Sequence, residues 1–286
     1  MEFLQALYSN PLLFSAVLAG FLASICSGVI GSYVVVKRIV FISGSIAHSV
    51  LGGIGLCVWL ERTHGISWII PLYGALITGV LSALIIGWIH LHYREREDTV
   101  IAAIWSLGMA SGVIFISQTP GFNVELTSFL IGNILWVSPQ DLWLLVVLDL
   151  VVLGFVITMH KKFLVICFDE EQAKLQGVSV NTYYLLLLSL IAITIVMLIQ
   201  IVGIILVMTL LTIPAAIGNM FTGRLSLMMM IAIVLCALFS FFGMAASFYL
   251  DWPSGATIAL VAGACYLFSL WFFDRRRLVI NRSPRV

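Results

Sequence analysis

Two ionisable side chains interrupt long apolar stretches, and they are the residues best suited to do chemistry. His48 lies in the apolar segment 43–60, with Ser45 three residues before it and Ser49 beside it. A neutral imidazole is a good ligand for Zn²⁺, Mn²⁺ or Fe²⁺, and a histidine in apolar surroundings usually faces protein or a water-filled cavity. His48 is therefore a candidate metal ligand. The alternative is a histidine that only packs against a neighbouring helix and hydrogen-bonds to it.

Asp149 is the other such side chain, with three apolar residues on either side, 146–148 and 150–152. An unpaired carboxylate in apolar surroundings costs at least a few kcal/mol, so Asp149 needs a partner. We favour a bond to a neighbouring helix over a place on a polar pathway. Pro214 also interrupts an apolar run, where it removes one backbone hydrogen bond and favours a kink. Kinked segments line pathways or serve as structural bends.

No arrangement of residues indicates covalent chemistry. Five cysteines are scattered singly, without a C-x-x-C pair, so neither a disulfide framework nor a zinc cluster is predicted. The H-E-x-x-H motif of metalloproteases is absent, and so is the G-x-x-x-x-G-K-[ST] phosphate loop. We therefore predict that the chain is not an enzyme and binds no cofactor of its own. If ATP drives its action, another chain must hydrolyse it.

The composition shows which elements must position these side chains. Of 286 residues, 62% are hydrophobic and 9% are charged, against about 25% charged in an ordinary soluble domain. A spanning helix needs about 20 apolar residues, and several uncharged runs reach that length. The 14 Lys and Arg nearly cancel the 13 Asp and Glu, so no basic field indicates nucleic acid. We predict an all-α polytopic protein whose surroundings are a lipid bilayer.

Charges and turn residues divide the chain into nine candidate spans, or eight if one run does not cross. The spans are expected at 11–36, 43–60, 67–90, 100–118, 142–160, 182–200, 201–221, 226–250 and 256–273. The 41 uncharged residues of 181–221 must form a hairpin, because a single helix of that length would be about twice the membrane thickness. We expect its turn at 200–203. No linker breaks the chain, so residues 1–286 are predicted to form one membrane domain.

The distribution of Lys and Arg predicts the orientation. Nine spans place all 14 of these residues except Arg62 on one side, and the positive-inside rule makes that side the cytoplasm. The basic tail 274–286 and the C-terminus are then cytoplasmic, and the N-terminus is outside. The loop 119–141 is expected outside.

A polar interruption at 160–178 is the longest on the predicted cytoplasmic side. Asp169 is placed to cap a short helix, Glu170 and Glu171 suit its first turn, and Gly177 is placed to end it. This pattern predicts an amphipathic helix of two turns. A solvated connecting loop is the alternative.

The segment Asp169-Glu-Glu-Gln-Ala-Lys-Leu-Gln-Gly-Val resembles the D-x-E-x-A-x-x-x-G-V segment with which permeases of ATP-binding-cassette importers contact their ATPase. Nearly the whole chain resembles the zinc, manganese and iron permeases of this class. Further matches, in order, are Val36-Lys-Arg-Ile-Val-Phe-Ile-Ser-Gly-Ser-Ile-Ala-His-Ser, Gly132-Asn-Ile-Leu-Trp-Val-Ser-Pro-Gln-Asp-Leu, Leu211-Thr-Ile-Pro-Ala-Ala and Asp251-Trp-Pro-Ser-Gly-Ala-Thr.

This resemblance implies a homodimeric permease in the bacterial plasma (inner) membrane. Two cytoplasmic ATPases and an extracytoplasmic metal-binding receptor protein would complete the importer. The coupling segment would be about 163–178, with Asp169, Glu170, Glu171, Ala173 and Gly177 in its motif.

The resemblance also bears on the candidate metal site. Many relatives carry Asp one turn before the histidine, where it completes a pair of ligands suited to a divalent metal. This chain has Gly44 there, which implies an altered metal preference or less dependence on side-chain ligation. We take Gly44, Ser45, Asp149 and Pro214 as pathway candidates beside His48.

The function predicted from the sequence is ATP-driven import of a divalent transition metal. An ATPase-independent secondary transporter or cation channel is the alternative. It would favour several intramembrane ionisable residues or inverted repeats. The sequence has one clear intramembrane carboxylate and no convincing repeat.

Overall fold

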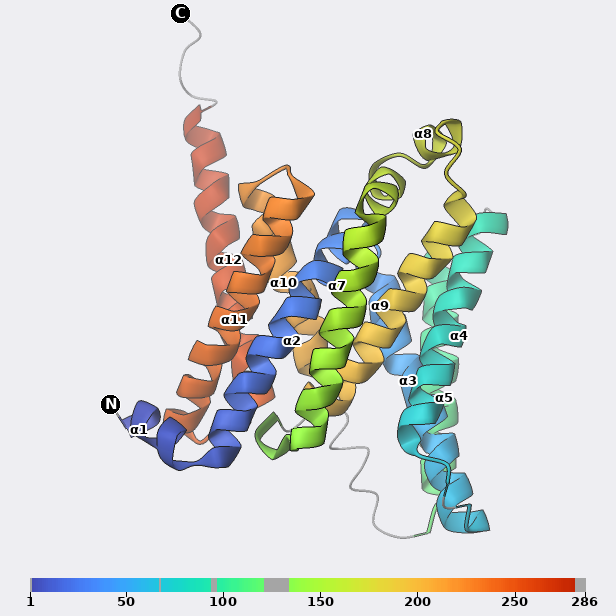
Figure 1. Ribbon diagram of the computed structural model, residues 1–286, viewed down its shortest axis with the longest axis vertical. Coiled ribbons are helices and arrows are strands. Elements are labelled where there is room, and N and C mark those ends of the chain that lie inside the picture. The colour runs from blue at the N-terminus through green and yellow to red at the C-terminus, as the bar shows by residue number, and fades with distance from the viewer. Residues whose placement is uncertain (1, 67, 94–96, 121–133, 281–286) are drawn as a thin grey trace, which may run out of the picture.

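The structure is a computed structural model in which long helices run back and forth along one direction (Figure 1). It describes residues 2–66, 68–93, 97–120 and 134–280. Within these residues, nine helices are long and apolar enough to cross a membrane. They are α2 (Pro11–Val36), α3 (Val40–His64), α4 (Pro71–His92), α5 (Glu97–Ser117), α7 (Pro139–Phe168), α9 (Val180–Val202), α10 (Ile204–Phe221), α11 (Leu225–Leu250) and α12 (Ser254–Ile280). Three short helices complete the set: α1 (Glu2–Ser9), η1 (Ile134–Trp136) and α8 (Glu170–Leu175).

All nine predicted spans correspond to these helices, and the number nine is confirmed for the described residues. Most of the helices extend a few residues beyond the predicted limits. The largest difference is in α7, which continues to Phe168 rather than ending near residue 160. Phe163 and Ile166 are fully buried, so this polar-looking stretch has an apolar face that packs and stays helical. The polar interruption expected at 160–178 therefore starts at Asp169.

Local sequence signals set the helix ends. Proline is the first residue of α2, α4 and α7. The N–H that proline lacks would have no partner within the helix at this position, so no hydrogen bond is lost. Ser138 and Asp141 form a reciprocal capping box at the start of α7. The uncharged hairpin turns at Gly203, whose φ is 82°, within the predicted stretch 200–203.

The helices form a bundle with a buried centre. α2, α3, α9 and α10 contribute most of the fully buried apolar side chains, whereas α5, α7 and α12 expose large apolar residues. Close approaches are made by α3 against α4 and α5, and equally by α2 against α10. A Cβ built on Gly53 of α3 would lie 2.1 Å from the carbonyl oxygen of Gly74 on α4. A Cβ on Gly108 of α5 would lie 2.3 Å from the Cα of Ser49, so these backbones pack directly on one another.

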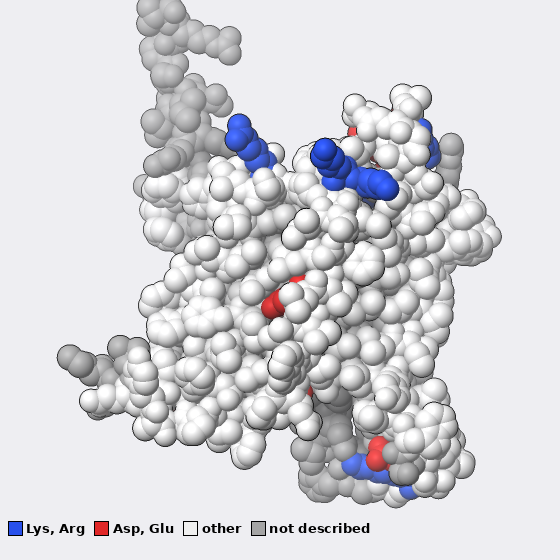
Figure 2. Space-filling model, in the orientation of Figure 1, with Lys and Arg blue, Asp and Glu red and all other residues white. Residues whose placement is uncertain are grey.

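The two ends of the bundle differ in what they carry. The short helix α1 lies at one end, and α8 and the end of α12 lie at the other (Figure 1). In the face shown by Figure 2, Lys and Arg gather mainly at the α8 end, and the broad middle is almost free of charge. That distribution is expected for a protein whose middle lies in hydrocarbon. Most of the loop 119–141 and the end of the basic tail fall outside the described residues.

Candidate functional site

The predicted capped helix is present as α8, at one end of the bundle. Oδ1 of Asp169 accepts hydrogen bonds from the backbone N–H groups of Glu171 and Gln172, both at 2.9 Å. Ala173 is fully buried and holds the helix against the bundle. Gly177 ends it with φ of 74°, a left-handed conformation that glycine adopts without steric cost. Both ends of α8 are thus fixed by its own residues.

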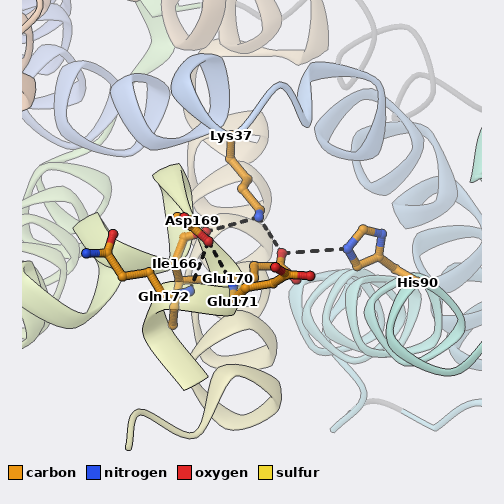
Figure 3. Close-up of polar contacts among 7 residues, drawn as sticks. All are labelled: Lys37, His90, Ile166, Asp169, Glu170, Glu171 and Gln172. Atoms are coloured by element: carbon orange, nitrogen blue, oxygen red, sulfur yellow. Dashed lines mark hydrogen bonds and ion pairs between the residues drawn. The ribbon is translucent and has the colours of Figure 1, made fainter. Parts of the chain in front are cut away.

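Glu170 connects α8 to two spanning helices (Figure 3). Its Oε1 lies 2.5 Å from Nζ of Lys37, at the end of α2, and 3.9 Å from Nε2 of His90, at the end of α4. Lys37 also donates to the carbonyl oxygen of Ile166, 3.1 Å away near the end of α7. The root of α8 is therefore tied to the ends of α2, α4 and α7.

Sequence reasoning did not find this connection. Lys37 entered the prediction only through the orientation and as part of a matched family motif. Lys37 and Glu170 are 133 residues apart, and neither lies in a local pattern that indicates the other. The only signal was that both were predicted at the cytoplasmic ends of spans.

His48 is half-buried on α3 and stacks on a tryptophan. The rings of His48 and Trp105 of α5 have centroids 4.3 Å apart and lie 11° from parallel. The indole Nε1 of Trp105 donates to Sδ of Met109, 3.1 Å away. Nδ1 of His48 is buried and has no hydrogen-bond partner among the described residues. The hydrogen-bonded packing histidine offered as the alternative is thus not supported at this nitrogen.

The surroundings of His48 explain how glycine is accommodated at position 44. A Cβ on Gly44 would lie 3.4 Å from Cε of Met208 and 3.5 Å from the Trp105 ring, so a longer side chain would compete with both. Ser45 donates its hydroxyl to the carbonyl oxygen of Ile101 on α5, at 2.9 Å. The small residues on this face of α3 therefore let a neighbouring helix approach closely, and that helix is α5.

Asp149 is buried and bonded to a neighbouring helix. Its Oδ1 accepts a 3.1 Å hydrogen bond from the backbone N–H of Cys26 on α2, while Oδ2 has no partner among the described residues. The bond to a neighbouring helix that the sequence favoured is present.

Pro214 lies buried inside α10, and the backbone compensates for its missing N–H. The carbonyl of Leu210, which a residue with an N–H at position 214 would engage, accepts instead from Sγ of Cys236 on α11, at 3.3 Å. Pro214 thereby creates an interhelical contact.

These side chains do not converge on a single metal centre. Across the described parts of the chain, no group of three or more His, Cys, Asp or Glu residues lies close enough to hold a metal ion. Asp149 contacts α2, whereas His48 contacts α5, so the two do not share a site.

Comparisons with known proteins agree with this architecture. A model of the ABC 3 transport family matches residues 9–273. A "Probable metal transport system membrane protein" of Chlamydia trachomatis is 49% identical over 260 residues, covering 91% of this chain and 88% of that protein. The "Manganese transport system membrane protein MntC" of Halalkalibacterium halodurans is 34% identical over 283 residues, covering 99% and 94%.

Two solved structures share the fold. "PsaBC from Streptococcus pneumoniae in complex with Fab" superposes with a TM-score of 0.81 at 28% identity, covering 94% of each chain. An inward-facing putative metal-chelate type ABC transporter superposes with a TM-score of 0.67 at 17% identity, which shows the fold alone. Because the family match extends over nearly the whole chain, this protein belongs to the ABC 3 transport family and is a membrane-spanning permease subunit of an ABC transporter, not itself an ATPase.

Proposed function

We propose that the chain is the permease of an ATP-driven importer of divalent transition metal ions, with manganese the first candidate among manganese, zinc and iron. The curated relatives named for metal or manganese transport support the substrate class. The observation that carries the coupling to ATP is α8. It is a helix capped at both ends, at one end of the bundle, with its root tied to three spanning helices.

In this proposal the ATPase binds the coupling segment 163–178. Asp169 and Gly177 give α8 its shape, Ala173 anchors it, and Glu171 is exposed to the partner. Glu170 faces the bundle instead, where it passes a displacement of α8 to α2 and α4. The end of α7, where Phe163, Ile166 and Cys167 are buried, is the root on which the helix moves.

The complete importer consists of two copies of this chain, two cytoplasmic ATPases and an extracytoplasmic metal-binding receptor protein. Residues 1–286 form its transmembrane domain, in a bacterial plasma membrane. The α8 end and the basic tail after residue 274 face the cytoplasm. The gathering of Lys and Arg at the α8 end supports this orientation (Figure 2).

His48 is the proposed transit ligand, and Gly44 and Ser45 are its neighbours on the pathway. The unpartnered Nδ1 supports that role. Asp149 and Pro214 serve mainly in packing between helices. Asp149 accepts a hydrogen bond from α2, and Pro214 leaves the Leu210 carbonyl free to accept one from α11.

The test is metal uptake in a bacterial host deprived of its own high-affinity manganese, zinc and iron importers. The chain is expressed with the ATPase and receptor encoded beside it, and accumulation of each metal is measured. We expect manganese uptake that disappears when the ATPase carries a lysine substitution in its phosphate loop. Uptake that survives loss of the ATPase would establish the secondary transporter or channel instead.

A further inference from the structure

A cavity of about 460 Å³ lies at the α8 end of the bundle, apart from the pathway residues. Its walls come from the end of α2 and the turn after it, from the last residues of α7, and from the end of α10, the turn after it and the start of α11. The polar side chains in the lining are Lys37, Arg38, Asn219 and Thr222, and the lining contains no Asp or Glu. It is therefore a cavity with cations and hydrogen-bonding groups but no anion of its own.

The two cations of this cavity behave differently. Lys37 is turned toward Glu170, which neutralises it. Arg38 is exposed and forms no ion pair or side-chain hydrogen bond with the described residues. An unpaired guanidinium presents five N–H donors in a planar arrangement that matches a carboxylate or a phosphate.

The backbone at Arg38 is unusual for the residue it carries. The N–H of Arg38 bonds to the carbonyl of Val35, and the N–H of Ile39 bonds to that of Val34, at 3.1 and 3.0 Å. This is the helix ending that normally has glycine in its left-handed position, as α8 has with Gly177. Here the position is Arg38, with φ of 62°. Residues held in such strained conformations cluster at functional sites, where the particular side chain is needed.

The cavity adjoins the coupling helix. Cys167 and Phe168 line it, and the next residue, Asp169, caps α8. A protein that grips α8 would therefore extend over the cavity mouth. This step rests on the proposed function, in which that protein is the ATPase.

We propose that the cavity is a second docking point for the ATPase, and that Arg38 binds a carboxylate of the ATPase there. α8 carries the motion, and the Arg38 contact fixes the angle at which the ATPase meets the bundle. Asn219 on α10, an exposed residue of the same lining, supplies an amide donor for this carboxylate.

The first experiment uses the chain co-expressed with its ATPase and reconstituted in vesicles of phosphatidylcholine, a lipid without net charge. Arg38→Gly relieves the left-handed backbone and removes only the side chain, so the permease should remain folded. We expect ATPase binding to weaken about thirtyfold or more, as for loss of one partner of a buried, hydrogen-bonded interfacial charge pair. Arg38→Lys should retain part of the binding. The matched control is Lys161→Gln, which removes another exposed cation at this end of the bundle. Glutamine is used instead of glycine because Lys161 lies within α7, and this variant should bind the ATPase normally.

A second measurement identifies the partner group. Carbodiimide joins amines to carboxylates but does not join guanidinium groups, so Arg38→Lys should yield a cross-link to an Asp or Glu of the ATPase that the unmodified chain lacks. Mass spectrometry of the linked peptides would locate it.

Two outcomes would overturn the proposal. One is normal ATPase binding by Arg38→Gly together with no cross-link at Arg38→Lys. The other is a binding defect that appears only in vesicles with anionic lipid, which would assign the cavity to a lipid headgroup. If the unmodified chain fails to bind the ATPase at all, the proposed function fails instead, which separates the two failures.

Discussion

At the scale of single residues, the His48–Trp105 stack determines how the candidate ligand is presented. One ring face of the imidazole is covered by the indole, so a metal would approach a nitrogen in the ring plane. Nδ1 has no hydrogen-bond partner among the described residues. Nδ1 therefore does not hold the structure together through a hydrogen bond to the described residues.

The first prediction concerns this histidine. His48→Ala should lower metal uptake about tenfold or more, since loss even of a group that orients a ligand costs that much in metal affinity. His48→Asp should keep part of the uptake, because a carboxylate ligates hard and borderline divalent ions. Uptake by each variant, normalised to its abundance in the membrane, is the measurement.

The control is His48→Gln, which replaces hydrogen bonding but is a poor ligand. Uptake kept by Gln and lost by Asp would exclude ligation by His48. Gly44→Asp is a companion variant. The Met208 and Trp105 contacts leave little room for its carboxylate, so a changed metal preference would require the indole to move.

At the scale of elements, α8 depends on the conformation of one residue. Gly177 has φ of 74°, and a Cβ built there meets nothing within 4 Å. Any effect of a substitution must therefore come from the backbone rather than from a steric clash with a neighbour.

The second prediction concerns substitutions of Gly177, which act through the backbone conformation alone. Gly177→Val should raise the free energy of this helix ending by about 1–2 kcal/mol, because a branched residue disfavours the left-handed conformation. ATP hydrolysis should then proceed with less metal carried per ATP. Gly177→Asn is the matched control, since asparagine tolerates this conformation, and it should transport nearly normally. Equal metal-to-ATP ratios in the two variants would contradict the role of α8.

Elements were also the scale at which the sequence was most informative. Uncharged runs of about span length located all nine helices, and Asp169 and Gly177 located α8, because caps are local signals. The predicted end of α7 was wrong because Lys161 and Lys162 suggested a loop, whereas Phe163 packs on the bundle and keeps the chain helical.

Contacts between distant helices could not be predicted. The Trp105 stack and the Lys37–Glu170 pair depend on packing between segments that carry no mutual pattern.

At the scale of the whole molecule, the odd number of crossing helices places the two described ends of the chain on opposite sides of the bundle (Figure 1). The α8 turn lies at one end, and the turn from α11 to α12 lies at the other. These two turns are therefore reporters for the two sides of the membrane.

The third prediction tests this arrangement. A membrane-impermeant maleimide added outside intact cells should label Ser254→Cys and leave Gln176→Cys unlabelled. The starting chain needs Cys265→Ser, because Cys265 is the exposed native cysteine in the described residues and the other four are buried. Labelling of Gln176→Cys from outside would invert the orientation and with it the proposed cytoplasmic ATPase. Asn123→Cys, in the loop outside the described residues, should be labelled like Ser254→Cys.

The direct backbone packing of α3 on α4 and α5 limits which mutations the gene can tolerate at the glycines in these contacts. Every missense change of one base in a glycine codon introduces a residue with a Cβ. At Gly53 that atom would fall 2.1 Å from a carbonyl oxygen, and at Gly108 it would fall 2.3 Å from a Cα. Both clashes are with backbone atoms, so a substitution would have to displace a neighbouring helix. No single-base missense step from either codon leads to a side chain that fits. Random mutagenesis scored by metal-dependent growth should therefore recover variants readily on the exposed faces of α5 and α12 and leave Gly53 and Gly108 unchanged among the survivors.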